Sequence, residues 1–374
     1  MRIQETSRVA PQASASTRPP LGILGPRPLR GRRTLPTSRP RCRSGQVLFN
    51  TCVCASVYML DATFSDLEPL PQDDGPVPVV RIAYPDGFEE VMSYFRRVVV
   101  TGECSQRTLQ LSAEVIAHNA ANYTAWQYRR RCLEAMHSGS SNAAREQAWR
   151  EELAFCTARG RENLKNYQVW FHRRSCLARL GSGPEAELEF VAEILRDDSK
   201  NYHAWGHRQW VLSSCGGWDG EAAFVEGLLE EDARNNSAWN QRYFLLQHTA
   251  DLSSLSVAEG EVDFAARYIA AAPGNPSPWN YLRGVVEPLG YSAVPRVRLL
   301  CEGLLAGDAA SGAGRVAAMS LLVDVLDEGG DPAEQERARS LCDSLEDLDS
   351  LREAYWQWRR SRVGAQQPTS PYAQ

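Results

Sequence analysis

A short motif occurs five times in the sequence, and this repetition restricts the fold more than any other feature. Each copy places Asn four residues before Trp, and the first four copies also place Arg three residues after it. The tryptophans, spaced by 34 to 44 residues, are Trp126, Trp170, Trp205, Trp239 and Trp279. Repeats of this period are typical of stacked helical pairs. The sequence therefore predicts an all-α array in which each helical hairpin packs on its neighbours.

Each motif position has a structural role if the motif opens a helix. Asn is a favoured N-cap, and Trp and Arg then fall at the fourth and seventh helical positions, on one face. We expect Trp to pack inward and the Arg guanidinium to reach a neighbouring turn or loop carbonyl. Because these residues recur in every layer, we assign them to the scaffold rather than to chemistry. Besides the tryptophans, the scaffold residues are Asn122, Asn166, Asn201, Asn235, Asn275, Arg129, Arg173, Arg208 and Arg242.

The segments around the motifs indicate where the folded part begins and ends. Apolar residues at helical spacing, such as Leu188, Val191 and Leu195, predict a partner helix between motifs. After the last motif the spacing continues without Asn and Trp, which predicts degenerate capping pairs. We expect one helical-repeat domain over 64–360, a disordered Arg/Ser/Pro-rich extension over 1–63 and a disordered tail over 361–374. The extension is a variable tail, a targeting peptide or a mis-assigned start.

Composition excludes several classes of protein. The net charge is −5, and the arginines of the N-terminal 45 residues conceal a more acidic body, so nucleic acid is not an expected partner. The ten cysteines form no CxxC pair, which favours reduced, core-packed thiols and a cytoplasmic location. No apolar run reaches bilayer-spanning length, and we expect no stable membrane insertion.

The distribution of lysine singles out one region for chemistry. Of the 41 basic residues only two are lysines, Lys165 and Lys200, each five residues before a motif Trp. Equivalent residues of neighbouring repeats should lie side by side, so we expect these lysines to cluster with Tyr167, Tyr202 and His203. Such a patch of cations and hydroxyls suits a diphosphate leaving group. The alternative is that the tyrosines only extend the helix caps and that the lysines are simply solvated.

Other chemical signatures are weak or missing. His203 and His207 have the i, i+4 spacing of a zinc pair, but the residues between them lack the glutamate of HExxH. We therefore predict no metal site in this chain. No nucleotide-binding, nucleophile-elbow or kinase motif is present, so a self-contained enzyme is not expected.

At these residues the sequence resembles the α subunit shared by protein farnesyltransferase and protein geranylgeranyltransferase type I. The likeness covers roughly residues 64–360 and rests on the motif and on longer runs. The most specific runs are PLPQDDGPVPVVRIAY at 69–84, KNYQVWFHRR at 165–174, KNYHAWGHRQW at 200–210 and DARNNSAWNQRYF at 232–244. The resemblance implies a right-handed superhelix of about seven helical pairs, a crescent around a β subunit.

The resemblance also implies an activity. The heterodimer would transfer farnesyl or geranylgeranyl from the prenyl diphosphate to the cysteine of a C-terminal CaaX sequence, as in many small GTPases. Lys165 would act on the departing diphosphate, with Tyr167, Tyr202 and His203 near it. Lys200 matches in type only and is a weaker candidate. Zn²⁺ is expected in the β subunit, and Mg²⁺ with the diphosphate.

The fourth and fifth motifs depart from the pattern without touching a predicted site residue. Asn236 and Pro276 replace the motif Tyr, and the last Arg moves to Arg283. Two other functions remain open: the α subunit of a Rab-type geranylgeranyltransferase, and a non-enzymatic helical-repeat scaffold. The choice of isoprenoid, of β subunit and of protein substrate cannot be predicted from this chain.

Overall fold

The computed structural model describes residue 60 and residues 62–80, 82–307 and 312–365. These residues belong to one compact unit that spans 52–374. Within the described ranges the chain forms fifteen α-helices and one short 3₁₀ helix, and no strand. The predicted all-α fold class is confirmed. What we predicted for 1–59 and 366–374 lies outside the described residues.

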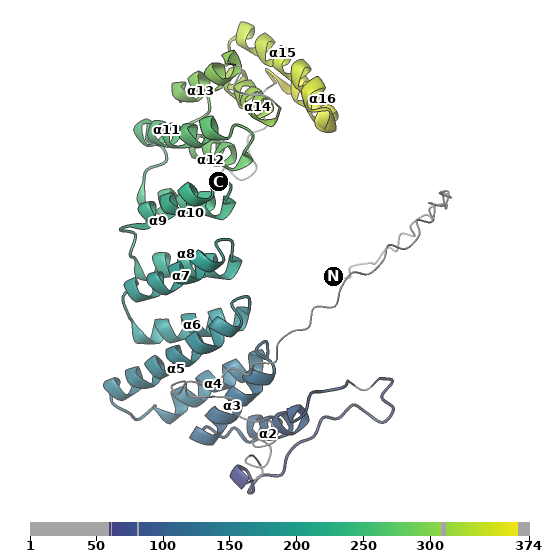
Figure 1. Ribbon diagram of the computed structural model, residues 1–374, viewed down its shortest axis with the longest axis vertical. Coiled ribbons are helices and arrows are strands. Elements are labelled where there is room, and N and C mark those ends of the chain that lie inside the picture. The colour runs from purple at the N-terminus through teal and green to yellow at the C-terminus, as the bar shows by residue number, and fades with distance from the viewer. Residues whose placement is uncertain (1–59, 61, 81, 308–311, 366–374) are drawn as a thin grey trace, which may run out of the picture. The chain divides into compact units, whose positions relative to one another are not determined.

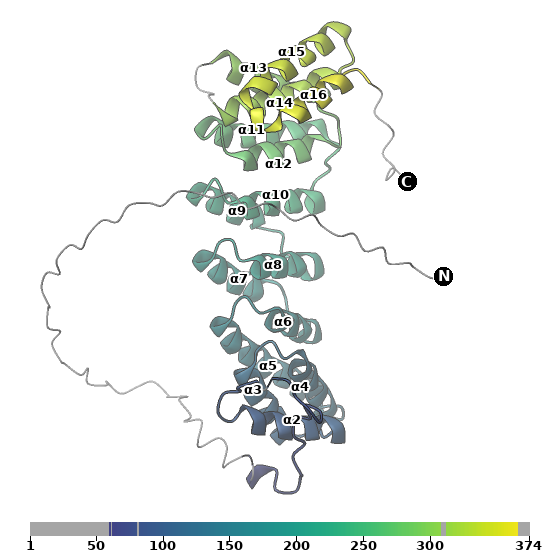
Figure 2. The same cartoon turned by 90° about the vertical axis from the view of Figure 1, so that its right-hand side faces the viewer.

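Helical pairs follow one another in chain order after α2 (Phe88–Thr101), as Figure 1 shows. Figure 2 shows the two helices of a pair lying side by side. The pairs that carry the motif on their second helix are α3 (Gln106–His118) with α4 (Tyr123–Met136), α5 (Asn142–Glu162) with α6 (Tyr167–Leu180), α7 (Glu185–Asp197) with α8 (Tyr202–Cys215), α9 (Glu221–Glu231) with α10 (Asn236–Thr249), and α11 (Leu255–Ala271) with α12 (Pro276–Val286).

Two further pairs lack the motif and complete the seven in the described part. They are α13 (Pro295–Ala306) with α14 (Ala313–Glu328), and α15 (Pro332–Leu348) with η1 (Ser350–Arg352) and α16 (Glu353–Arg362). In α16, Trp356 is buried, and Arg359 forms ion pairs with Asp324 and Asp327 of α14. The degenerate C-terminal pairs expected from the apolar spacing are therefore present.

The motif asparagines cap the helices, as predicted. In all five copies the Asn side chain accepts a hydrogen bond from a backbone N–H in the first turn of the helix that follows. Each cap satisfies a donor that the helix itself cannot pair, which is worth about 1 kcal/mol.

The motif tryptophans are buried, and the one polar atom of each side chain, the indole Nε1, is hydrogen-bonded. Each indole Nε1 donates to the backbone carbonyl six residues earlier at 2.8–2.9 Å. In the later repeats the same carbonyl also accepts a hydrogen bond from the Asn side chain of the next copy. The Ser199 carbonyl accepts from Trp205 at 2.9 Å and from Asn235 at 3.1 Å. One carbonyl thus joins the tryptophan of one repeat to the helix cap of the next.

The motif arginines bind carboxylates, where we expected a turn or loop carbonyl. Arg129 and Arg208 also donate to backbone carbonyls, but these lie within α3 and α7. Arg173 Nε lies 2.5 Å from Glu187 Oε1, and Arg208 Nη2 lies 2.6 Å from Glu221 Oε2. A buried guanidinium needs a charge partner, and a carbonyl does not supply one. The four glutamates, each on the first helix of the following repeat, are Glu152, Glu187, Glu221 and Glu261. We call them the glutamate ladder.

A second side chain, two residues after the motif Trp of the second to fifth copies, completes every rung of the ladder. His172 and His207 approach Glu152 and Glu187 at 2.5 Å through Nε2. In the later repeats Gln241 and Tyr281 occupy the same position on Glu221 and Glu261. The phenylalanine three residues after each glutamate lies under the arginine, with the guanidinium carbon 3.5–3.8 Å from the ring centroid.

The packed structure extends slightly beyond the predicted limits of 64 and 360. Leu60 and Phe64 are buried, and Arg107 donates to the Thr63 carbonyl at 3.0 Å. At the other end Val363 is buried, and its carbonyl accepts from Arg339 at 3.1 Å. The apolar side chains at both ends cover the outermost helices, which explains why the packed region is longer than the motif-bearing core.

Candidate functional site

The predicted site residues lie at the N-terminal ends of two neighbouring helices. Tyr167 and Tyr202 are the first residues of α6 and α8, His203 follows Tyr202, and Lys165 precedes the cap Asn166. Because α6 and α8 contact one another, these ends share one edge of the array. We call Lys165, Tyr167, Tyr202 and His203 the site rim.

Aromatic contacts connect the two repeats at this edge. The Tyr167 and His203 rings meet edge to face with centroids 4.2 Å apart, and Tyr202 contacts His203 at 5.6 Å. Both tyrosines remain largely exposed, at 68% and 74%. Their hydroxyls are therefore available to a ligand or a partner rather than to the core.

Tyr167, Tyr202 and His203 line a hollow of about 410 Å³. None of the residues that line it is Asp or Glu. The residues that line this hollow include two tyrosines, a histidine and an arginine. Such a surface suits an anion.

The surroundings of His203 favour its neutral imidazole. Partial burial lowers its pKa, and a hydrogen bond with the Lys165 backbone acts in the opposite direction. A neutral ring can donate one hydrogen bond and accept another, so His203 can take part in binding without adding a charge.

The two lysines occupy equivalent positions but different surroundings. Lys165 Nζ lies 3.6 Å from Asp198, and Lys200 Nζ lies 3.1 Å from Asp232. Lys165 also lines a smaller hollow of about 280 Å³ with Tyr167. Lys200 lines neither hollow. Four of the five residues expected to cluster therefore line two hollows that have Tyr167 in common. Lys200 is the exception.

Sequence reasoning missed four residues of the larger hollow: Gln168, Phe171, Arg174 and Gly206. It also missed the whole glutamate ladder. The sequence does contain a signal for the ladder. The pattern ExxF occurs at 152–155, 187–190, 221–224 and 261–264, and each glutamate lies 18 residues before the next motif Trp. No comparable repetition marks Gln168 or Phe171.

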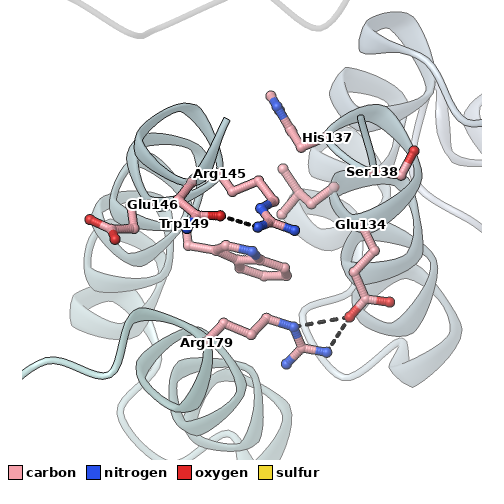
Figure 3. Close-up of a pocket in the computed structure, with 9 residues that line it drawn as sticks. Glu134, His137, Ser138, Arg145, Glu146, Trp149 and Arg179 are labelled. Atoms are coloured by element: carbon pink, nitrogen blue, oxygen red, sulfur yellow. Dashed lines mark hydrogen bonds and ion pairs between the residues drawn. The ribbon is translucent and has the colours of Figure 1, made fainter. Parts of the chain in front are cut away.

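A separate hollow of about 340 Å³ lies at the opposite end of α6 (Figure 3). Figure 3 shows the Trp149 indole between Arg145 and Arg179. Arg179 donates to Glu134 at 2.9 Å, and Arg145 donates to Asn142. Two carboxylates, those of Glu134 and Glu146, also belong to its lining, so it suits an anion less well than the hollow at the site rim.

The described residues contain no cluster of His, Cys, Asp or Glu side chains that could hold a metal ion. His203 and His207 do not converge, since His207 is buried against Glu187 and His203 lies at the site rim. Among the described helices, none has both the length and the apolar character needed to cross a membrane.

Comparison with known proteins identifies the repeat. The family described as protein prenyltransferase alpha subunit repeat matches residues 105–136, 149–180, 184–215, 218–249 and 258–289. These ranges contain the second helices that carry the motif, from α4 to α12. The repeats found from the tryptophan spacing are thereby confirmed.

A solved structure and two relatives extend the match to most of the chain. The fold is similar to a chain of Candida albicans protein geranylgeranyltransferase-I complexed with GGPP, with a TM-score of 0.67 and 24% identity over 80% of this chain and 98% of that one. The protein farnesyltransferase/geranylgeranyltransferase type-1 subunit alpha of Solanum lycopersicum is 41% identical, covering 81% of this chain and 90% of its own. That of Dictyostelium discoideum is 36% identical, covering 81% and 93%. The chain belongs to the family of α subunits of protein farnesyltransferase and geranylgeranyltransferase type-1.

Proposed function

We propose that this chain acts with a β subunit to transfer farnesyl or geranylgeranyl from a prenyl diphosphate to the cysteine of a C-terminal CaaX sequence. Family membership supports the reaction class. The observation that carries the local role is the shared edge of the site rim, where residues of two neighbouring repeats gather around hollows that no Asp or Glu lines.

Lys165 is the proposed catalytic residue. In the transfer, the thiolate sulfur of the substrate forms a bond to the prenyl carbon while the bond from that carbon to the diphosphate oxygen breaks. The diphosphate leaves with the electron pair, so negative charge grows on it in the transition state. An ammonium at its edge stabilises that charge without covalent chemistry. The Lys165–Asp198 pair is long and exposed, so it can exchange for a diphosphate contact at little cost.

Tyr167, Tyr202 and His203 are proposed to hold the diphosphate. Two phenolic hydroxyls from neighbouring repeats can donate to its oxygens, and the Tyr167–His203 contact fixes one phenol against the next repeat. Lys200 remains a weaker candidate. We place the zinc expected for the family in the partner subunit and the magnesium with the diphosphate, and no step is assigned to a metal held by this chain.

The remaining proposals concern the setting of the enzyme. We assign the chain to the cytoplasm and its substrates to CaaX proteins such as small GTPases. The helical-repeat domain is proposed to be the whole functional unit, with the segments before and after it outside the site.

Co-expression with candidate β subunits, followed by transfer assays with farnesyl and geranylgeranyl diphosphate, tests this function. We expect no transfer by this chain alone, transfer by the heterodimer, and a large loss in Lys165→Ala at unchanged assembly. Transfer only to Rab-type substrates would favour the Rab-type enzyme instead. Failure to bind any β subunit would favour a non-enzymatic scaffold.

A further inference from the structure

The hollow at the site rim contains a cation that the sequence did not single out. Arg174, on α6, is half-buried and lines the hollow with Tyr167, Tyr202 and His203. Its Nη2 donates to the Gly206 carbonyl at 2.7 Å, and its Nε donates to His207 Nδ1 at 3.4 Å. Both acceptors are uncharged, so these bonds orient the guanidinium without neutralising it.

No ion pair joins Arg174 to a carboxylate within the described part of the chain, in contrast to the motif arginine beside it. Arg173 binds Glu187 through two nitrogens, at 2.5 and 2.7 Å. Burial lowers the pKa of Arg174, and no charged neighbour offsets that effect. Arginine nevertheless remains protonated in proteins. A desolvated cation without a counter-charge favours the binding of an anion.

The position of Arg174 links it to the predicted diphosphate contacts. The hollow that contains Arg174 and the smaller one that contains Lys165 share Tyr167 and Gln168. An anion with two charged groups can therefore meet a cation in each hollow. The Lys165 side chain is 78% exposed and forms a long ion pair with Asp198, whereas Arg174 is held by two hydrogen bonds.

We propose that Arg174 is a second cationic contact to the diphosphate, in addition to Lys165. This inference rests on the proposed function and adds a residue to the same site. Arg174 binds the diphosphate and makes or breaks no covalent bond. Its planar guanidinium can meet two phosphate oxygens at once, which a lysine cannot do.

Arg130 provides a matched control because it has the equivalent position in the preceding repeat. Its Nη1 lies 3.1 Å from His172 Nδ1, the counterpart of the Arg174–His207 contact. Arg130 does not line the hollow. A purely structural role would therefore make the two arginines behave alike, and an anion-binding role would separate them.

The test measures inhibition of the heterodimer by inorganic diphosphate, competing with the prenyl diphosphate, after size-exclusion chromatography has verified assembly. We expect Arg174→Ala to raise the inhibition constant about tenfold or more, since a charged hydrogen bond is lost. Arg130→Ala should change it less than about twofold. Arg174→Lys should recover part of the loss, and its inhibition should depend more strongly on salt.

Arg174→Gln keeps the test decisive if the alanine variant assembles poorly. Glutamine can still donate to the Gly206 carbonyl, so a structural role predicts nearly normal inhibition by diphosphate. The anion-binding role predicts a loss close to that of Arg174→Ala. An assembled Arg174→Gln enzyme with an unchanged inhibition constant would overturn this inference. Inactivity of the wild-type heterodimer would instead refute the proposed function, so the two failures are distinguishable.

Discussion

The glutamate ladder and the site rim use similar chemical groups in opposite ways. In the ladder, three carboxylates are buried and that of Glu261 is partly buried, each with an arginine on one side and His, Gln or Tyr on the other. At the site rim, Tyr167, Tyr202 and Lys165 are largely exposed and have few partners. Residues that recur in each repeat are satisfied by the repeats themselves. The residues of the site rim are not satisfied in this way and are left for a ligand.

The largest effect on stability is expected at the ladder. Glu187→Ala would leave the Arg173 guanidinium buried without its carboxylate and remove the partner of His207. Breaking one side of a buried ion pair costs about 3–5 kcal/mol. Urea denaturation of the α subunit, monitored by circular dichroism, should show that loss.

Glu189→Ala is the matched control, on the same helix. Glu189 is exposed and bonded only to Arg196 at 3.4 Å. We expect its substitution to change the free energy of unfolding by less than about 0.5 kcal/mol. Equal effects of the two substitutions would mean that the ladder does not stabilise the array.

A smaller effect is expected at the tryptophans. Trp239→Phe keeps most of the buried ring but removes the N–H that donates to the Ala233 carbonyl. That carbonyl still accepts from Asn275 at 2.7 Å, so the cost should be near the lower end of about 1–3 kcal/mol. The same substitution at the exposed Trp358 should leave the urea midpoint nearly unchanged. A reversed order would contradict the assignment of Trp239 to the scaffold.

The smallest effect concerns pH. Arg130 donates to His172 Nδ1, so Nε2 carries the hydrogen that is donated to Glu152. Burial lowers the pKa of His172 below its usual 6.5, and the pKa of Glu152, held by His172 and Arg129, is also lowered. Both groups stabilise the fold above their unfolded pKa values, and this stability is lost as pH falls through the folded ones.

We therefore expect the urea midpoint to decline as pH falls below about 6.5, first through His172 and His207. The double substitution His172→Gln and His207→Gln introduces the side chain that Gln241 supplies in a later repeat. It should flatten the decline between pH 6.5 and 4.5. A profile identical to that of the wild type would show that these histidines do not titrate on unfolding.

Much of the scaffold was predictable because its signals are local. An Asn that caps a helix and a Trp four residues further on interact within about one turn, and both appear as a fixed spacing in the sequence. The carboxylate partners of the motif arginines were not predicted. Glu187 and Glu221 lie on the next repeat, and only the packing of the two repeats brings each one to its arginine. A search for a second repeated pattern would have found them through ExxF.

The site was predictable only in part, for a similar reason. Lys165 and Tyr167 stood out by composition and by resemblance, and the stacking of equivalent positions brought Tyr202 and His203 to the same edge. Arg174 did not stand out because arginine is abundant in this chain. Its distinction is that it lines the hollow at the site rim and has no carboxylate partner among the described residues, which only three-dimensional contacts reveal.

The most direct test of the division between scaffold and site rim is a single-turnover rate. It is measured for the Lys165→Ala heterodimer at saturating substrates, with Lys200→Ala in parallel. Both lysines are exposed, equivalent in the repeat and paired with an aspartate. We predict a fall of about 10²–10³-fold for Lys165→Ala, as for the loss of one stabilising donor, with an unchanged urea midpoint. Lys200→Ala should stay within about threefold of the wild type. Equal rates for the two variants would contradict the account.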